Sequence, residues 1–208
     1  PLERSERRLG LLLLAPAFLL LSAVVLYPIA QLVVTSFTFN HLAQPWMGTP
    51  FVGFENYAKA LGDGRFWEAT WHTVLYILIT VPGAVVVGLG LALLANQPRS
   101  LYEAAEIDGA GKWQQFWEIT LPMLRPAIVV ALIFRTITAI QTFDIPYAMT
   151  NGGPGNSTET LAMYIHKTTI DFLDLGYGSA LAVLMFVVSL VMTAGYLRYT
   201  RRDPRQEA

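Results

Sequence analysis

The chain has 208 residues, of which 54% are hydrophobic and only 14% are charged. Soluble domains carry roughly 25% charged residues, so this composition argues against a water-soluble globular protein. The 14 lysines and arginines nearly cancel the 15 acidic residues, and a formal net charge of −1 offers no basic surface for nucleic acid. The absence of cysteine excludes disulfides, thiolate metal sites and a cysteine nucleophile.

Four apolar segments are long enough to cross a membrane as helices. The first covers residues 11–34. A cleavable signal peptide is the rival interpretation, because Arg7 and Arg8 precede the segment, but the apolar run is too long for a signal. The other spans are expected over residues 73–95, 127–143 and 178–197. The prediction is an all-α, polytopic membrane helix bundle that forms one transmembrane domain over residues 1–208.

The basic residues predict the orientation of these spans, because lysine and arginine concentrate on the cytoplasmic side. They gather before the first span, between the second and third, and after the fourth. The opposite loops, near residues 36–70 and 146–176, carry only Lys59, Arg65 and Lys167. Both termini and the central loop are therefore expected in the cytoplasm.

The central loop, residues 101–122, has the pattern of two short helices joined by a tight turn. A helix is expected over 103–108, and Gly109 can take the left-handed conformation that ends it. A second helix is expected over 112–120, with a boundary at Pro122.

The same loop offers a surface suited to a partner. Trp113, Phe116 and Trp117 follow an i, i+3, i+4 spacing and so share one helix face. The first helix of the loop is acidic, with Glu103, Glu106 and Asp108. The loop could dock into a cleft of a soluble partner, or it could lie as an amphipathic helix at the lipid headgroups.

The spacing of residues in the loop resembles a known motif, and this resemblance favours docking to a partner. It fills every position of the EAA motif, EAA-x3-G-x9-I-x-L-P, with Glu103-Ala104-Ala105, Gly109 and Ile119-Thr120-Leu121-Pro122. The chain thus resembles the membrane subunits of binding-protein-dependent ABC importers. Shorter segments look like the carbohydrate-uptake branch, which includes maltose and trehalose importers: Leu26-Tyr27-Pro28 and residues 51–57, 143–147, 150–154 and 176–180.

The resemblance implies a set of partners. It implies a second, distinct membrane subunit, two ATPase subunits, an extracytoplasmic solute-binding protein, and the plasma membrane of a bacterium or archaeon, with its lipid around the spans. ATP and Mg²⁺ would be bound by the ATPase, so this chain is expected to bind no cofactor and not to be an enzyme. The residues that would contact the ATPase lie in the loop and are Glu103, Ala104, Ala105, Asp108, Gly109 and Lys112.

The resemblance also implies a gap. The family has six core spans, two of them between the segments that here end near residue 97 and begin near residue 101. About 70–80 residues are therefore expected to be absent there, enough for two spans. An absent pair of spans leaves the predicted orientation unchanged.

The lack of an energy-coupling site in the sequence also favours an importer driven by a partner ATPase. The spans contain no Asp or Glu of the kind that an ion-coupled carrier uses, and the chain has no GxxxxGK[ST] phosphate loop. A self-contained carrier or channel is the rival prediction. A membrane-embedded enzyme is a second rival, but no Ser-His-Asp arrangement or GxSxG turn is present, and Ser22 and Ser189 are better explained by bonds to helix backbone.

The expected solute is a sugar, in particular a disaccharide such as trehalose or maltose. Aromatic rings stack on sugar C–H surfaces, and amides and carboxylates bond hydroxyls, which suggests Gln141, Asp144, Tyr147 and Asn151 as residues of the solute path. Three of the four also have a plain alternative: Asp144 as a local cap, Tyr147 in an interfacial belt, and Asn151 in a turn.

Arg135 is the only charge within the third span. It could be a functional charge, a partner of Asp144, or a bond donor to backbone carbonyls, and a structural role between helices is the first expectation. His41, His72 and His166 are far apart in the sequence, so they are expected to be interfacial residues rather than metal ligands.

Overall fold

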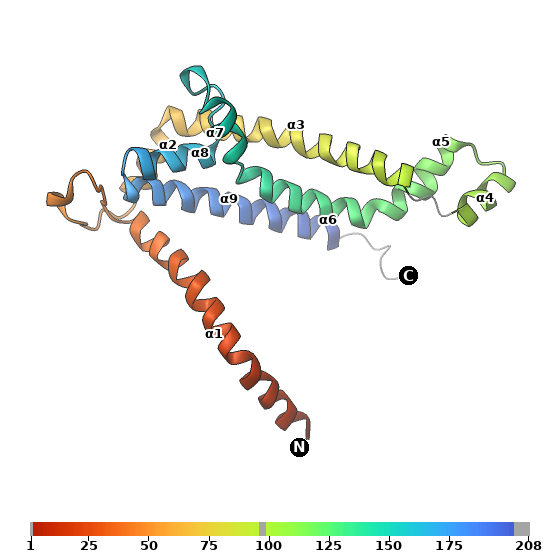
Figure 1. Cartoon of the computed structure of the whole chain (residues 1–208), viewed down its shortest axis with the longest axis horizontal. Coiled ribbons are helices and arrows are strands. Elements are labelled where there is room, and N and C mark those ends of the chain that lie inside the picture. The colour runs from red at the N-terminus through yellow and green to blue at the C-terminus, as the bar shows by residue number, and fades with distance from the viewer. Residues whose placement is uncertain (1, 96–98, 202–208) are drawn as a thin grey trace. The chain divides into compact units, whose positions relative to one another are not determined.

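The computed structural model describes residues 2–95 and 99–201, and Figure 1 shows the course of the chain. Residues 2–95 and 99–201 contain helices, turns and two isolated β-bridges, with no strand, so the prediction of an all-α fold is confirmed. The expected gap near residues 97–101 falls partly on residues 96–98, which lie outside the described residues, and it stays a prediction.

The helices follow one another along the chain with short connections. They are α1 (Leu2–Ser36), η1 (Pro45–Met47), α2 (Glu55–Gly62), α3 (Gly64–Ala95), α4 (Arg99–Ile107), α5 (Lys112–Gln115), η2 (Phe116–Thr120), α6 (Leu121–Ile140), α7 (Asp144–Thr150), η3 (Pro154–Asn156), α8 (Leu161–His166), η4 (Lys167–Asp171) and α9 (Leu175–Arg201). The elements η1 and η3 are 3₁₀ turns, and η2 and η4 are π-helical.

Four of these helical segments are long and apolar enough to cross a membrane, as expected. They cover Leu12–Ser36, Gly64–Ala92, Lys112–Ile140 and Leu175–Gly195. The third differs most from its prediction, because helical structure begins in the polar loop and ends at Ile140, three residues earlier than expected. Hydropathy marks the apolar part of a helix, whereas the backbone continues into its polar flanks.

The expected boundary at Pro122 is wrong. The chain stays helical from Lys112 through η2 into α6, and Pro122 lies in the first turn of α6. Proline is tolerated at the start of a helix, and a π-helical turn replaces the ordinary i to i−4 pattern just before it. The loop and the third span therefore form one continuous helical segment.

Contacts divide the chain into two compact units. The first consists of Pro1–Asp63 and Ile165–Leu184, and the second of Gly64–Tyr164 and Met185–Ala208. One transmembrane domain over residues 1–208 stays a prediction.

In the first unit, α1 is tied to α2 by polar bonds at its carboxyl end. Ser36 is fully buried, and its Oγ lies 2.6 Å from the hydroxyl of Tyr57. The Asn56 amide donates to the backbone carbonyls of Ser36 and Thr38, at 2.9 and 3.0 Å. These bonds satisfy carbonyls at the helix end that would otherwise lack partners.

Gly176 brings the start of α9 against the loop after α1 in the same unit. Its N–H donates to the carbonyl of Asn40 at 3.0 Å, and a Cβ at this position would collide with the backbone carbonyl of Thr38. A residue without a side chain is therefore required here.

In the second unit, α3 and α6 run side by side and antiparallel (Figure 1). Their facing positions include Ala84, Gly88, Ala127 and Ala131. Small residues let membrane helices approach closely without any hydrophobic driving force between them. The central loop lies at one end of this pair, and α7 lies at the other.

Candidate functional site

The central loop folds into a helix–turn–helix elbow, as its sequence predicts. The N–H of Ala110 donates to the carbonyl of Ala105 at 2.9 Å, and the N–H of Gly109 donates to that of Glu106 at 3.0 Å. This pair of bonds is the Schellman motif, which requires a left-handed residue after the helix. Gly109 supplies it with φ of +82°. The turn therefore depends on glycine for its backbone angle, since a Cβ would meet nothing within 4 Å.

Two polar residues that no motif pointed to, Tyr102 and Gln115, hold the elbow together with Thr120 of the EAA motif. The hydroxyls of Tyr102 and Thr120 lie 2.6 Å apart and join α4 to the end of η2. Gln115 is buried, and its amide donates to the carbonyl of Ala110 at 2.9 Å. The elbow is therefore internally braced before any partner is present.

The outside of the elbow combines apolar and charged groups. Ile107 is 87% exposed and Trp113 75% exposed. The ring centroids of Trp113, Phe116 and Trp117 lie within 6.2 Å of one another, which confirms the predicted aromatic face. Among the predicted contact residues, Ala105 is buried, and the other five are exposed: Glu103, Ala104, Asp108, Gly109 and Lys112. Such a surface suits docking to a partner, and the role of each residue in it stays a prediction.

A pocket of about 330 Å³ lies at the other end of the second unit, between α3, α7 and the segment after α7. Its walls are mainly aliphatic, with one imidazole and several hydroxyls. They are formed by His72, Leu75, Tyr76, Ile145, Pro146, Met149, Thr150, Ser157, Thr158 and Thr160. Apolar walls with a few polar groups are typical of small-molecule sites.

The four predicted path residues do not line this pocket. Gln141 caps the end of α6, Asp144 and Tyr147 lie on α7, and Asn151 caps its carboxyl end. Helical spacing puts these three on one face of α7, and the residues that line the pocket come from the opposite face. The Tyr147 ring stacks on that of Phe143 at 4.9 Å, and Asn151 ends α7 in a left-handed conformation with φ of 48°. Whether the four contact a solute stays a prediction.

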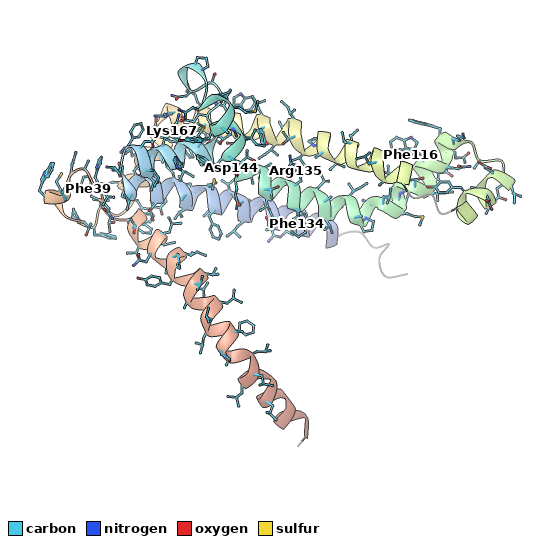
Figure 2. All side chains as sticks on the ribbon, in the orientation of Figure 1. Phe39, Phe116, Phe134, Arg135, Asp144 and Lys167 are labelled. Atoms are coloured by element: carbon cyan, nitrogen blue, oxygen red, sulfur yellow. The ribbon has the colours of Figure 1, made fainter. Side chains whose placement is uncertain are left out.

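A second pocket, of about 360 Å³, follows the groove between α3 and α6. Small and aliphatic residues line it, and Arg135 is the single charged residue among them. The walls are Ala84, Val85, Gly88, Leu89 and Ala92 of α3 and Leu124, Ala127, Ile128, Ala131 and Arg135 of α6. Because the helices are antiparallel, Arg135 faces the Ala84 end of the groove, toward the pocket at α7. Figure 2 shows Arg135 on α6 and Asp144 at the start of α7.

A buried ion pair fixes the segment after α7 to the start of α3. Glu159 is fully buried and accepts two bonds from Arg65, at 2.7 Å from Nε and 2.8 Å from Nη2. The Arg65 guanidinium also lies 4.9 Å from the ring centroid of Tyr164. The forked geometry is the strong form of an arginine–carboxylate pair. The scarcity of basic residues in the outer loops was the one sequence signal for Arg65.

Further hydrogen bonds surround this pair. His72 Nδ1 donates to the carbonyl of Glu159 at 3.2 Å, and the N–H of Leu161 donates to Thr73 Oγ1 at 2.8 Å. Thr160 Oγ1 donates to the carbonyl of Thr142 at 2.9 Å. Each residue of the segment 159–161 therefore forms at least one hydrogen bond to another part of the second unit.

The first unit has its own polar cluster. Lys59 Nζ lies 3.4 Å from Asp174 and 4.1 Å from the ring centroid of Tyr177. The Tyr177 hydroxyl donates to Asp63 at 3.0 Å. The Lys59 side chain is 58% exposed, which makes this pair more solvated than that of Arg65.

The described residues contain no group of three or more His, Asp or Glu side chains placed to hold a metal ion. His72 lines the α7 pocket, and the ring of His41 stacks against that of Phe39 at 6.4 Å.

The comparison with known families decides the identity of the fold. The family model described as "Binding-protein-dependent transport system inner membrane component" matches residues 7–202. The chain belongs to this family. The resemblance carried by the EAA motif is thereby confirmed, and the polytopic helix bundle is a permease fold.

Relatives cover much of the chain. It is 45% identical to the sulfoquinovosyl glycerol transport system permease protein SmoG of Agrobacterium fabrum, over 96% of this chain and 92% of the relative. It is 38% identical to the trehalose/maltose transport system permease protein MalF of Thermococcus litoralis, over 75% of this chain and 47% of the relative. The alignment with SmoG extends over 286 positions against 208 residues here, so part of that permease has no counterpart in this chain.

Solved structures share the fold. The chain is similar to one in the crystal structure of a bacterial ABC transporter involved in the import of the acidic polysaccharide alginate, with a TM-score of 0.71 and 18% identity. The similarity covers 98% of this chain and 99% of that chain. At this identity the likeness shows the fold alone.

Proposed function

We propose that this chain is the membrane subunit of an ATP-driven sugar importer and forms half of its translocation path. The observation that carries the proposal is the exposed, internally braced elbow, which fills the EAA motif in a chain of the binding-protein-dependent family. Relatives named for sulfoquinovosyl glycerol and for trehalose and maltose support a sugar as the solute.

The second membrane subunit completes the path, because one chain lines only one side of it. Two ATPase subunits receive the elbow, bind ATP and Mg²⁺ and carry out hydrolysis, while this chain has no catalytic role. An extracytoplasmic binding protein delivers the sugar to the side that carries the α7 pocket. Both termini are cytoplasmic, in the plasma membrane of a bacterium or archaeon.

The α7 pocket is the first contact for the sugar in this proposal. Its hydroxyls and the Tyr76 ring supply the hydrogen bonds and the stacking surface that a sugar requires. Gln141, Asp144, Tyr147 and Asn151 contact the sugar from the other face of α7 when the second membrane subunit is in place.

The test is purification of the tagged, full-length chain from native membranes in mild detergent, followed by an ATPase assay of the eluate. ATPase activity should copurify with the wild type and fall at least about tenfold with Glu103→Lys, which corresponds to about 1.4 kcal/mol of binding free energy. Asp171→Lys is the matched control, because it makes the same charge change at an exposed residue outside the elbow.

Equal ATPase activity with both variants would contradict the docking role of the elbow. Purification of the wild type without any ATPase, together with uptake driven by an ion gradient alone, would favour a self-contained carrier.

A further inference from the structure

Arg135 lies within a candidate membrane-spanning segment, Lys112–Ile140, and is exposed in the structure. It is five residues, about 7.5 Å at 1.5 Å per residue, before the end of α6. A guanidinium remains charged in every protein environment, and its exposure to hydrocarbon is costly. Arginines at such positions therefore face a cavity or a partner.

No residue in the described ranges forms an ion pair with Arg135. Asp144, the nearest acidic residue along the chain, lies beyond the end of α6 and is exposed. Among the described residues the guanidinium therefore retains donors for a further group.

The groove between α3 and α6 gives that group a place to bind. Its volume of about 360 Å³ falls in the range of about 300–1,000 Å³ typical of ligand pockets. Ala84, Gly88 and Ala92 on α3 and Ala127 and Ala131 on α6 leave the space, because their side chains are small.

The composition of the walls determines what can be recognised there. Apart from Arg135, every lining residue is aliphatic or glycine, so the groove offers neither a ring for stacking nor a second side chain for sugar hydroxyls. A neutral sugar would gain little from such walls. A guanidinium, in contrast, forms forked hydrogen bonds with the oxygens of an anion.

We propose that Arg135 binds the negatively charged group of an acidic sugar, a carboxylate or a sulfonate, in the α3–α6 groove. The proposal rests on the proposed function and specifies its substrate class. Arg135 lies at the end of the groove nearest the α7 pocket, so the anionic group meets it after the sugar hydroxyls have met that pocket.

The test is equilibrium binding to the purified, nucleotide-free membrane complex without its binding protein. Three radiolabelled probes differ in one group: methyl glucoside, methyl glucuronide, and the glucoside with a sulfonate in place of its primary hydroxyl. The wild type should bind at least one charged probe about tenfold or more tightly than the neutral one. Arg135→Gln should remove this preference, and Arg135→Lys should keep part of it. Arg125→Gln, on the same helix outside the groove, is the matched control.

Three results would overturn the proposal. These are a wild type without preference for charged probes, an Arg135→Gln complex that keeps the preference, and equal weakening of all three probes by that variant. The wild-type result stands even if Arg135→Gln does not assemble. Copurified ATPase activity, measured in the same samples, separates failure of this inference from failure of the importer assignment.

Discussion

The two ends of the second unit satisfy their polar groups in opposite ways. Beside α7, the carboxylate of Glu159 is fully buried and bonded twice to Arg65, and the adjacent backbone groups bond to His72 and Thr73. At the elbow, Glu103 and Asp108 are exposed, and in the described part of the chain neither belongs to an ion pair. Internal hydrogen bonds fix the backbone of the elbow, and the charged side chains of the elbow remain exposed.

This difference separates a structural polar site from the proposed docking site. A buried carboxylate without its cation is strongly unfavourable, so the Glu159 network stabilises the fold itself. Exposed charges cost nothing while solvated and become useful when a complementary surface arrives. Substitutions at the two ends should therefore change different measurements.

Glu159→Ala is expected to have the largest effect on stability. Removal of one partner from a buried ion pair costs about 3–5 kcal/mol. The unfolding temperature in detergent should fall by about 6–20 °C, at about 2–4 °C per kcal/mol for a chain of this size.

Two further variants sharpen that measurement. Asp171→Ala, at an exposed carboxylate, should leave the unfolding temperature nearly unchanged. The double variant Arg65→Met/Glu159→Met should recover part of the loss, because no charge is left buried without a partner. If the double variant is no more stable than Glu159→Ala, the ion pair is not the cause.

Gly109→Ala should act on docking rather than on the fold as a whole. An alanine in the left-handed region costs about 1–2 kcal/mol, which lowers the equilibrium constant between the native turn and its alternatives about 5- to 30-fold. Copurified ATPase activity should fall by up to the same factor. Gly111→Ala is the control, because Gly111 has φ of −69° and a Cβ there meets nothing within 4 Å. Equal losses in both variants would show that added bulk, not backbone angle, disturbs docking.

Lys59→Met should have the smallest effect. An exposed pair at 3.4 Å contributes about 0–1 kcal/mol. The change in unfolding free energy should stay below about 1 kcal/mol and diminish further in high salt, because exposed charges are screened. A loss as large as that of Glu159→Ala would mean that burial does not distinguish the two pairs.

The sequence was most informative where the decisive interactions are local. The turn at Gly109 and the aromatic face of Trp113, Phe116 and Trp117 follow from spacings of a few residues, and both are present in the structure. The four spans follow from length and apolar composition, which the backbone must satisfy inside a membrane.

Other features depend on information that no local pattern contains. Arg65 and Glu159 are 94 positions apart, so only the folded chain shows that they pair. The α7 pocket itself is formed by α3, α7 and residues 157–160, which are far apart in the sequence, and the role of Asp144, Tyr147 and Asn151 outside it stays a prediction. The boundary at Pro122 failed because the preceding π-helical turn allows the helix to continue.

That continuity has a mechanical consequence. Helical structure is unbroken from Lys112 to Ile140, and between α4 and α6 only residues 108–111 are not helical. Within residues 99–140, the turn at 108–111 is therefore the one break in helical structure, and α5, η2 and α6 form one continuous helical segment that carries Arg135 near its far end. A displacement of Trp113 would therefore move the whole helical segment, including those of its residues that line the groove, because no loop lies between them.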